Sequence, residues 1–305
     1  MTEPMVWLPF DPEDLGEVPE GLRFDMVLPN EVDVLPDSAA EVEFYVLPYQ
    51  FSPKDNEVMA QMPRLRVAQT LTAGIEHIVD AVPPGVTLCN GAGIHDDSTA
   101  ELALTLILSS LNGMPGFLRR QEEHQWRSLW RDALADRRVL IVGYGRIGAA
   151  IEDRLRPFQV DITRVARSAR TGVHAVADLP DLLPAADVVV LILPATAESR
   201  GLVNAGFLAA MKPGALLVNV ARGSIVDTDA LVDALEDGRI SAALDVTDPE
   251  PLPADHPLWR APNLLLTPHV GGASAAMWPR AHRLVRAQLR RYVAGEALVN
   301  VIPPG

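Results

Sequence analysis

Four short motifs in the second half of the chain carry the residue types that could perform chemistry. A glycine-rich segment, GYGRIG at 143–148, is followed by an arginine in NVARG at 219–223, a glutamate at Glu250 and a histidine, His269, in TPHVGG. Together they offer backbone amides for a pyrophosphate, a fixed cation, a carboxylate and an imidazole. These are the groups needed to move a hydride between a nicotinamide and a carbonyl that lies next to a carboxylate.

The glycine-rich segment has the context of a dinucleotide-binding loop. An apolar strand is predicted at 139–142 before it, and a helix is predicted from Ile147 onwards. The first glycine then allows a tight turn, the second lets the backbone approach a pyrophosphate, and the third lets helix and strand pack closely. The alternative is a tight strand–helix turn with no ligand. The residues expected to contact the cofactor here are Gly143, Tyr144, Gly145, Arg146, Ile147 and Gly148.

The residues after the next predicted strand indicate which dinucleotide binds. Sites for NAD usually carry an acidic residue at the end of this strand, bonded to the ribose 2′-hydroxyl. Ala166 occupies that position here, and Arg167, Ser168 and Arg170 follow it. Because guanidinium and hydroxyl groups suit a 2′-phosphate, the sequence favours NADP over NAD. The alternative is that these arginines belong to a solvated loop.

The candidate reacting residues all follow predicted strands, where the mouth of an α/β sheet site lies. A carboxylate at Glu250 beside an imidazole at His269 would orient the ring and favour its protonated form, which makes a usable general acid–base. Arg222 stands between two small residues, so its guanidinium can grip a carboxylate and polarise a carbonyl. The alternatives are a structural histidine in a turn and a surface arginine in a salt bridge.

Composition bounds the class of protein. With 305 residues, the chain is long enough for two domains. Its net charge of −14 argues against a general binder of nucleic acid or of anionic membranes. Cys89 is the only cysteine, so the sequence implies neither a disulfide nor an oxidising compartment, and no Cys/His pattern predicts a metal site. Without a signal-peptide pattern or a long apolar run, a cytoplasmic location is expected.

Strand–helix alternation predicts two α/β units, each with a largely parallel sheet. In the first part, strands are predicted at 5–8, 24–28, 43–47, 66–71 and 86–89, and partial helices at 38–43 and 53–61. A long helix then begins, with Ser98 as its cap and Glu101 completing a capping box. Strands follow at 138–142, 160–165, 187–193, 215–220, 242–246 and 264–267, with helices at 179–183, 204–211 and 229–237. The last helix, at 273–294, and the apolar tail after it should return to the first unit.

The motifs, in this order, resemble the D-isomer-specific 2-hydroxyacid dehydrogenase family, from about Val67 through His269 and the closing helix. The resemblance implies a Rossmann cofactor domain at 96–274 inserted in a flavodoxin-like substrate domain made of 1–95 and 275–305. It also implies a homodimer formed through the cofactor domain. The arginine-rich stretch after Val165 is most similar to the NADP-using glyoxylate and hydroxypyruvate reductases.

The resemblance assigns a role to individual residues. It makes Arg222, Glu250 and His269 catalytic in the reduction of a small 2-oxo acid. It also implies that the backbone amides of Ala73 and Gly74, together with Arg222, bind the substrate carboxylate. The remaining cofactor contacts that it implies are Pro194, Ala221 and, for the nicotinamide amide, Asp245.

Two features bear on how far the resemblance reaches. The segment 90–95 lacks the proline or tyrosine pattern common in the family, which leaves the substrate preference open, and Glu250 stands where the formate dehydrogenase branch carries glutamine. A nucleotide-sensing scaffold or corepressor with the same fold is the alternative function. The intact set of arginine, glutamate and histidine favours the enzyme.

Overall fold

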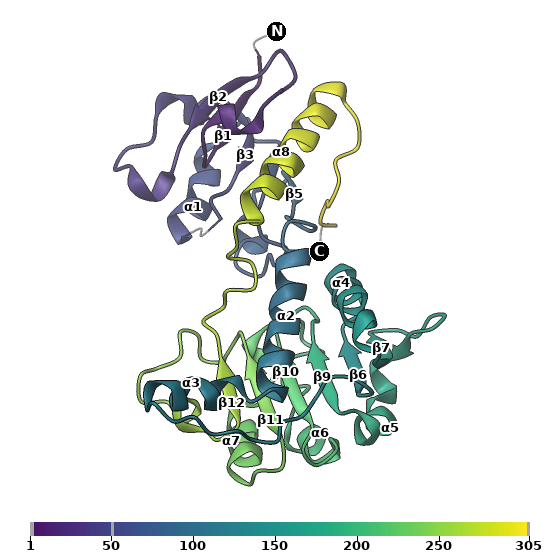
Figure 1. Cartoon of the computed structure of the whole chain (residues 1–305). Coiled ribbons are helices and arrows are strands. Elements are labelled where there is room, and N and C mark those ends of the chain that lie inside the picture. The colour runs from purple at the N-terminus through teal and green to yellow at the C-terminus, as the bar shows by residue number, and fades with distance from the viewer. Residues whose placement is uncertain (1–2, 50–51, 304–305) are drawn as a thin grey trace. The chain divides into compact units, whose positions relative to one another are not determined.

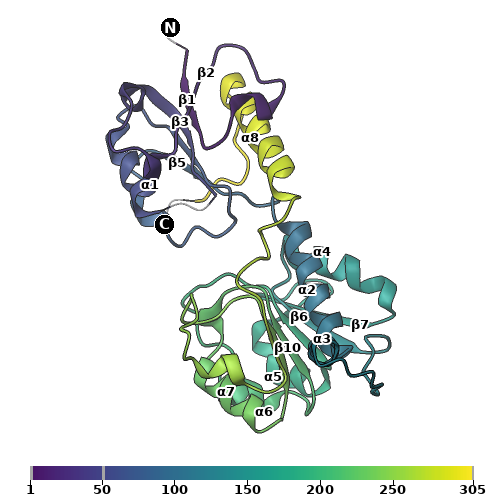
Figure 2. The ribbon, with the colours of Figure 1, turned by 60° about the vertical axis from the view of Figure 1, so that its left-hand side comes forward.

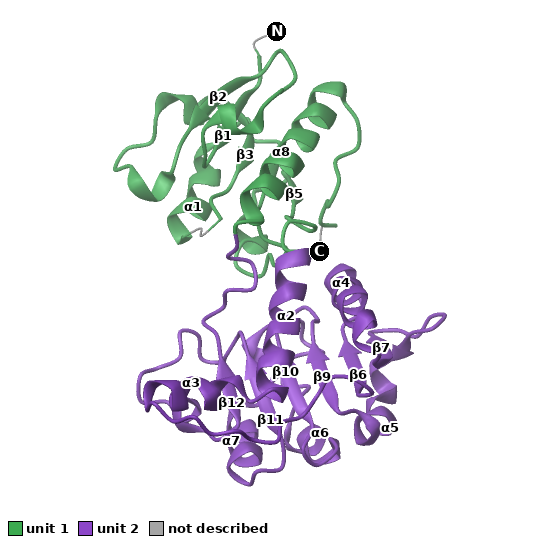
Figure 3. Ribbon diagram, in the orientation of Figure 1, with its two compact units in different colours: residues 1–95, 275–305 green, residues 96–274 purple. Residues whose placement is uncertain are grey.

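The computed structural model describes residues 3–49 and 52–303, and the chain divides into two compact units (Figure 3). Unit 1 comprises residues up to 95 together with residues from 275 onwards, and unit 2 comprises residues 96–274. Each unit is built around its own parallel sheet.

Unit 1 contains five described strands, all parallel, in the order β2-β1-β3-β4-β5. They are β1 (Met5–Leu8), β2 (Arg23–Met26), β3 (Val42–Val46), β4 (Val67–Gln69) and β5 (Thr87–Cys89). All five predicted strands are confirmed, but the predicted strand at 66–71 is shorter and ends at Gln69, beyond which the Thr70 hydroxyl donates to the carbonyl of Thr72 at 2.8 Å. The predicted helix at 38–43 is a 3₁₀ turn over Asp37–Glu41, and the one at 53–61 is α1 (Pro53–Glu57) continued as a 3₁₀ turn.

The last helix, α8 (Met277–Ala294), covers one face of the unit 1 sheet (Figure 2). Met277, Ala281, Val285 and Leu289 recur at helical spacing and are buried in one core with strand residues such as Val6. The tail after α8 is fastened to the sheet, since the amide of Ile302 donates to the carbonyl of Leu88 at 2.9 Å. The prediction that the end of the chain returns to the first unit is therefore confirmed.

Unit 2 contains seven described strands, all parallel, in the order β12-β11-β10-β9-β6-β7-β8 (Figure 1). They are β6 (Arg138–Val142), β7 (Asp161–Ala166), β8 (His174–Ala175), β9 (Val188–Leu191), β10 (Leu216–Asn219), β11 (Ser241–Leu244) and β12 (Leu264–Leu266). The strand order runs outwards in both directions from the β6–β9 pair. Such a doubly wound sheet has its ligand crevice at the carboxyl ends beside that reversal.

Helices cover both faces of the unit 2 sheet, and two separate apolar cores lie beneath them. One core receives residues of α2 (Asp96–Leu111) and α4 (Arg146–Leu155). The other receives residues of α5 (Leu179–Leu182), α6 (Ala205–Ala210) and α7 (Thr228–Glu236). The prediction of two doubly wound parallel sheets is confirmed, because the unit 1 order β2-β1-β3-β4-β5 also reverses direction, between β1 and β3.

The predicted start of the long helix is wrong. Helix α2 begins at Asp96, which places Ser98 inside the first turn rather than at the cap. Asp96 accepts a hydrogen bond from Arg146 at 2.8 Å and Asp97 accepts one from Arg154 at 2.6 Å. Acidic groups in a first turn also favour the helix N-terminus electrostatically. These two tertiary ion pairs explain why the helix starts before the capping-box pattern.

The sequence analysis also missed α3 (Met114–Glu122), and the charged segment after it has no regular structure as far as residue 136. Among the described residues, no single helix is long and apolar enough to cross a membrane. The consecutive helices α2 and α3, bent by 67°, reach the required length and composition only when they are taken together.

Candidate active site

The glycine-rich loop follows β6 and leads directly into α4. Gly143 has a φ of +111°, and a Cβ there would lie 2.2 Å from the carbonyl oxygen of Ile192. A Cβ on Gly148 would lie 2.4 Å from the carbonyl oxygen of Gly143, whereas one on Gly145 would meet nothing within 4 Å. Packing therefore requires glycine at 143 and at 148, whereas Gly145 faces open space beside the helix N-terminus. This geometry fits a pyrophosphate.

The other predicted cofactor residues lie at the carboxyl ends of neighbouring strands. Pro194 follows β9, and its carbonyl accepts a hydrogen bond from Ser199 at 2.7 Å. Ala221 follows β10 and is buried. The guanidinium of Arg146 is turned towards Asp96, while Ile147 is half-buried in the first turn of α4.

The predicted 2′-phosphate residues follow β7 and are exposed, but they differ in their surroundings. Arg170 donates from Nη2 to the carbonyl of Tyr144 at 2.5 Å, which ties it to the glycine-rich loop. Hydrogen bonds to Thr196 and to backbone lower the pKa of the Glu198 carboxyl, and the charge of Arg167 adds a smaller contribution. Ser168 lies between these two arginines in the sequence.

Arg222 lies in a tight turn directly after β10. The buried side chain of Asn219 accepts from the amide of Ala221 at 3.0 Å and donates to the carbonyl of Arg222 at 2.9 Å. A Cβ on Gly223 would lie 1.9 Å from the carbonyl oxygen of Thr247, so the turn packs tightly on the segment after β11. The half-buried Arg222 side chain is thus carried by a backbone that two neighbouring strand ends fix.

The structure brings Glu250 and His269 together. Glu250 Oε1 pairs with His269 Nδ1, and the two side chains are 39% and 46% exposed. Glu250 follows β11 and His269 follows β12, so the three predicted reacting residues come from the ends of β10, β11 and β12, which are neighbours in the sheet. Because Glu250 engages Nδ1, Nε2 is the nitrogen that can exchange a proton with a substrate.

Asp245 fixes the loop that carries His269. The buried Asp245 carboxylate accepts from the Thr267 hydroxyl at 2.6 Å and from the amides of Val270 and Gly271, both at 2.9 Å. Its carbonyl accepts from the amide of His269 at 2.7 Å. His269 itself has a φ of 53°, a left-handed conformation that is uncommon outside glycine. These hydrogen bonds hold the unusual backbone in place.

The predicted carboxylate-binding loop belongs to unit 1. The carbonyl of Ala73 accepts from the Asn90 side chain and that of Gly74 accepts from the Thr72 hydroxyl, both at 2.9 Å. Among the described residues, no protein acceptor engages the amide of Ala73 or Gly74. The loop is therefore ordered through its carbonyls, and its amides are the donors that it can offer to an anion.

Sequence reasoning did not single out Glu152, whose buried carboxylate on α4 binds Arg164 of β7. In the sequence it resembles one partner of an ordinary i,i+4 ion pair with Arg156, and nothing signals its burial. The clamping role of Asn219 was equally invisible, although Asn219 belongs to a motif that was recognised. Both roles depend on tertiary contacts.

Comparison with known proteins places this geometry in a family. The family model described as "D-isomer specific 2-hydroxyacid dehydrogenase, NAD binding domain" matches residues 104–271. The chain is 36% identical over 264 residues to a glyoxylate reductase of Thermofilum pendens, covering 81% of this chain and 78% of that one. It is also 34% identical over 262 residues to a D-3-phosphoglycerate dehydrogenase of Mycobacterium tuberculosis, covering 82% of this chain and 49% of that one.

A solved structure shows the same architecture. The chain is similar to a D-isomer specific 2-hydroxyacid dehydrogenase from Xanthobacter autotrophicus Py2 in complex with NADPH and MES, with a TM-score of 0.81 and 30% identity. The similarity covers 100% of this chain and 99% of that one. The chain therefore belongs to the D-isomer specific 2-hydroxyacid dehydrogenase family, in its glyoxylate/hydroxypyruvate reductase-like part, and is an NAD(P)-dependent oxidoreductase.

Proposed function

We propose that the protein reduces a small 2-oxo acid such as glyoxylate or hydroxypyruvate, and in reverse oxidises the D-2-hydroxy acid. The observation that carries the proposal is the pairing of Glu250 with His269 at the ends of β11 and β12, next to the strand that bears Arg222. The glyoxylate reductase among the relatives supports this substrate class. The phosphoglycerate dehydrogenase relative makes a larger, phosphorylated substrate the competing choice.

Each reacting side chain has one task in this proposal. A bound reduced nicotinamide supplies the hydride. His269 donates a proton from Nε2 to the carbonyl oxygen, while Glu250 holds Nδ1 and so fixes the ring and stabilises its charged form. Arg222 binds the substrate carboxylate with its planar fork and polarises the carbonyl.

We further propose that residues 1–95 and 275–305 form the substrate domain and residues 96–274 the cofactor domain. The unengaged amides of Ala73 and Gly74 support the first assignment, because a carboxylate needs such donors. The family match over 104–271 supports the second. A contact between Asp245 and the nicotinamide amide stays a prediction, since three donors already engage that carboxylate.

For the cofactor, we propose that Gly143–Gly148 and the N-terminus of α4 hold the pyrophosphate and that NADP is preferred to NAD. The preference is supported by the missing acidic residue at Ala166 and by Arg170, which is tied to the loop. The NADPH complex of the Xanthobacter relative is consistent with this choice. A nucleotide-sensing scaffold is not favoured, because such a role needs no acid–base pair.

A homodimer formed through unit 2 is also part of the proposal. The segment 114–131, here called the arm, comprises α3 and the irregular chain after it, and its Trp126 and Trp130 are each 104% exposed. Two exposed indoles in one segment are typical of a protein interface. We propose that a second copy of the chain covers the arm, and that the dimer is cytoplasmic.

The dimer is tested by measuring molar mass in solution. Replacing Trp126 and Trp130 with Ser should shift the wild-type dimer towards the monomer mass at equal concentration. Trp259→Ser provides a matched control, because Trp259 is an exposed tryptophan of unit 2 outside the arm. A monomeric wild type, or a dimer that survives loss of both arm tryptophans, would contradict the proposal.

The reaction is tested by screening a panel of 2-oxo acids with NADPH and with NADH. The panel includes glyoxylate, hydroxypyruvate, pyruvate and 3-phosphohydroxypyruvate. The proposal predicts the highest kcat/KM for one of the small unphosphorylated acids. Preference for the phosphorylated acid would replace the proposed substrate class and leave the reaction type unchanged.

A further inference from the structure

The ring of Tyr144, the second residue of the glycine-rich loop, contacts two guanidinium groups. The central carbon of Arg164 is 5.6 Å from the ring centroid, and that of Arg170 is 5.8 Å from it. Both distances are within the range of a cation–π interaction. The loop that is proposed to bind the cofactor thus carries two stacked cations on one aromatic residue.

Arg164 is the fixed member of this stack because it is bound to a buried carboxylate. Its Nε donates to Glu152 Oε2 at 2.5 Å and its Nη2 donates to Oε1. The Glu152 side chain is only 1% exposed and also accepts from Arg156 at 2.7 Å. Hydrogen bonds from Arg164, Tyr144 and Arg156 outweigh the cost of burial and lower the pKa of Glu152 to about 2. The carboxylate therefore stays ionised and anchors Arg164.

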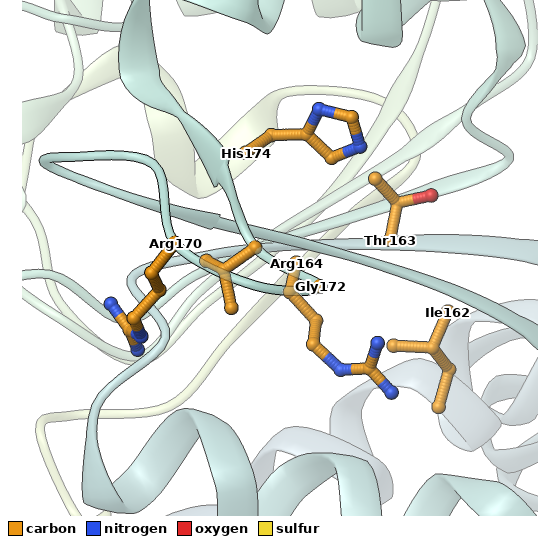
Figure 4. A pocket seen from close by; sticks show the side chains of 7 residues that line it. Ile162, Thr163, Arg164, Arg170, Gly172 and His174 are labelled. Carbon is orange, nitrogen blue, oxygen red and sulfur yellow. The ribbon is translucent and has the colours of Figure 1, made fainter.

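Arg170 is the accessible member of the stack. It is exposed, and it begins a short hairpin in which it exchanges two backbone hydrogen bonds with Val173, at 3.0 and 2.8 Å. A cavity of about 300 Å³ beside this hairpin is lined by both Arg164 and Arg170 (Figure 4). The hydrogen bond from Arg170 to the Tyr144 carbonyl and the contact with the Tyr144 ring hold the guanidinium at the edge of the loop.

We propose that Tyr144 is a positioning residue that holds Arg170 where it binds the 2′-phosphate of an adenosine nucleotide. The inference rests on the proposed preference for NADP. It adds that a residue that does not bind the phosphate itself sets how tightly the 2′-phosphate is bound. An arginine in solvent loses side-chain entropy when it binds, and a guanidinium that is already stacked loses less. Arg164, which contacts the same ring, adds a second positive charge.

Arg170 is assigned this task rather than Arg167 for a geometric reason. Among the described residues, no hydrogen bond or cation–π contact ties Arg167 to the glycine-rich loop, whereas Arg170 makes both. Arg170 contacts a neutral carbonyl and an aromatic ring, so its full charge remains for an anion. The phosphate is thus bound by one residue, Arg170, and that residue is positioned by another, Tyr144.

The inference is tested by isothermal titration of the whole protein with 2′,5′-ADP and with 5′-AMP, which differ by the 2′-phosphate. The ratio of the two dissociation constants reports that phosphate alone and does not depend on the fraction of folded protein. The variants are Arg170→Ala, Tyr144→Leu, the double variant, and Tyr144→Phe as a matched control that keeps the ring.

In the wild type, 2′,5′-ADP should bind about tenfold more tightly than 5′-AMP, a modest demand on a charge-assisted contact. Arg170→Ala should remove most of this ratio, and Tyr144→Leu should lower it about two- to fivefold, the size of an exposed cation–π contact. The double variant should match Arg170→Ala, while Tyr144→Phe should keep most of the ratio.

Three results would overturn the inference. If Tyr144→Leu kept the wild-type ratio, or if its effect simply added to that of Arg170→Ala, then Tyr144 would not act through Arg170. If the wild type bound both nucleotides equally, no 2′-phosphate site would exist there. Turnover of oxo acids with NADH would still support the proposed reaction. Failure of the proposed reaction and failure of this inference are therefore distinguishable.

Discussion

The two halves of the unit 2 sheet hold charged side chains in opposite ways. Beyond β10, β11 and β12, Glu250 and His269 form a pair that is 39% and 46% exposed. On α4, which follows β6, Glu152 is 1% exposed and binds Arg164 of β7 and Arg156. The first pair lies in the loops after β11 and β12, and the second joins a helix to the strand that follows it.

This difference follows the tasks that we propose for the two halves. An exposed ion pair contributes little to stability, so the Glu250–His269 pair can serve the chemistry with little effect on the fold. A buried carboxylate that is well paired resists protonation, and loss of its partner leaves an uncompensated charge. One half can therefore exchange protons, whereas the other keeps a fixed charge distribution around the cofactor loop.

The largest effect is expected at the exposed pair. His269→Ala should lower kcat for oxo-acid reduction by roughly 10²- to 10⁴-fold, the usual contribution of a general acid. Steady-state rates together with the dissociation constant of NADPH would check this, and the latter should stay close to wild type. A variant with kcat within twofold of wild type would show that His269 is not the proton donor.

Arg222 should show the next largest effect. Arg222→Lys is expected to lower kcat/KM by about 10²-fold, nearly as much as Arg222→Ala, because a point charge cannot replace a bidentate fork. Both variants are measured with the same oxo acid. Recovery of most of kcat/KM by lysine would mean that charge alone suffices.

The buried carboxylate should affect stability rather than chemistry. Its pKa is lowered to about 2 in the folded protein, so its contribution is complete above the ordinary carboxyl pKa near 4.5 and is lost as the pH falls towards 2. Glu152→Gln should lower the free energy of unfolding by about 2 kcal/mol at neutral pH. The difference from wild type should shrink below the ordinary pKa.

Asp153→Asn is the matched control for this prediction. Asp153 precedes Arg154 in the same helix, is largely exposed and comes only within 3.9 Å of Arg156. Its replacement should change the free energy of unfolding by less than about 0.5 kcal/mol. Denaturant unfolding at several pH values measures both variants. If both lost the same free energy of unfolding, the buried Glu152 carboxylate would have no special role in stability.

The smallest effect concerns the choice of cofactor. Wild type should use NADPH with a kcat/KM about tenfold above that for NADH, equal to 1.4 kcal/mol. Replacing Arg167 and Arg170 with Ala should abolish this preference, and added salt should weaken it in the wild type because both arginines are exposed. Equal or better use of NADH by the wild type would show that these arginines do not select the cofactor.

The sequence predicted the parts of this molecule that depend on local pattern. Strands such as β9 are short apolar runs buried on both faces, and the glycines at 143 and 148 stand where no side chain fits. Short elements such as β8, with two residues, leave too little pattern to detect. The start of α2 was misplaced because ion pairs to Arg146 and Arg154, distant in sequence, extend the helix.

The same limit applied to the candidate site. Arg222, Glu250 and His269 could be named because each lies in a recognisable motif after a predicted strand. The supporting contacts of Asp245, Asn219 and Glu152 are set by which strands and helices become neighbours. A side chain type and its spacing do not reveal such neighbours, so positioning residues are harder to predict than reacting ones.

The most direct test of the central claim is the stoichiometry and stereochemistry of one reaction. Hydroxypyruvate and NADPH are incubated with the wild-type protein, and the oxidised cofactor and the chiral hydroxy acid are both quantified. The account predicts one D-glycerate formed for each NADPH oxidised, with saturation in both substrates. Binding of NADPH without turnover of any 2-oxo acid, or formation of the L-acid, would contradict it.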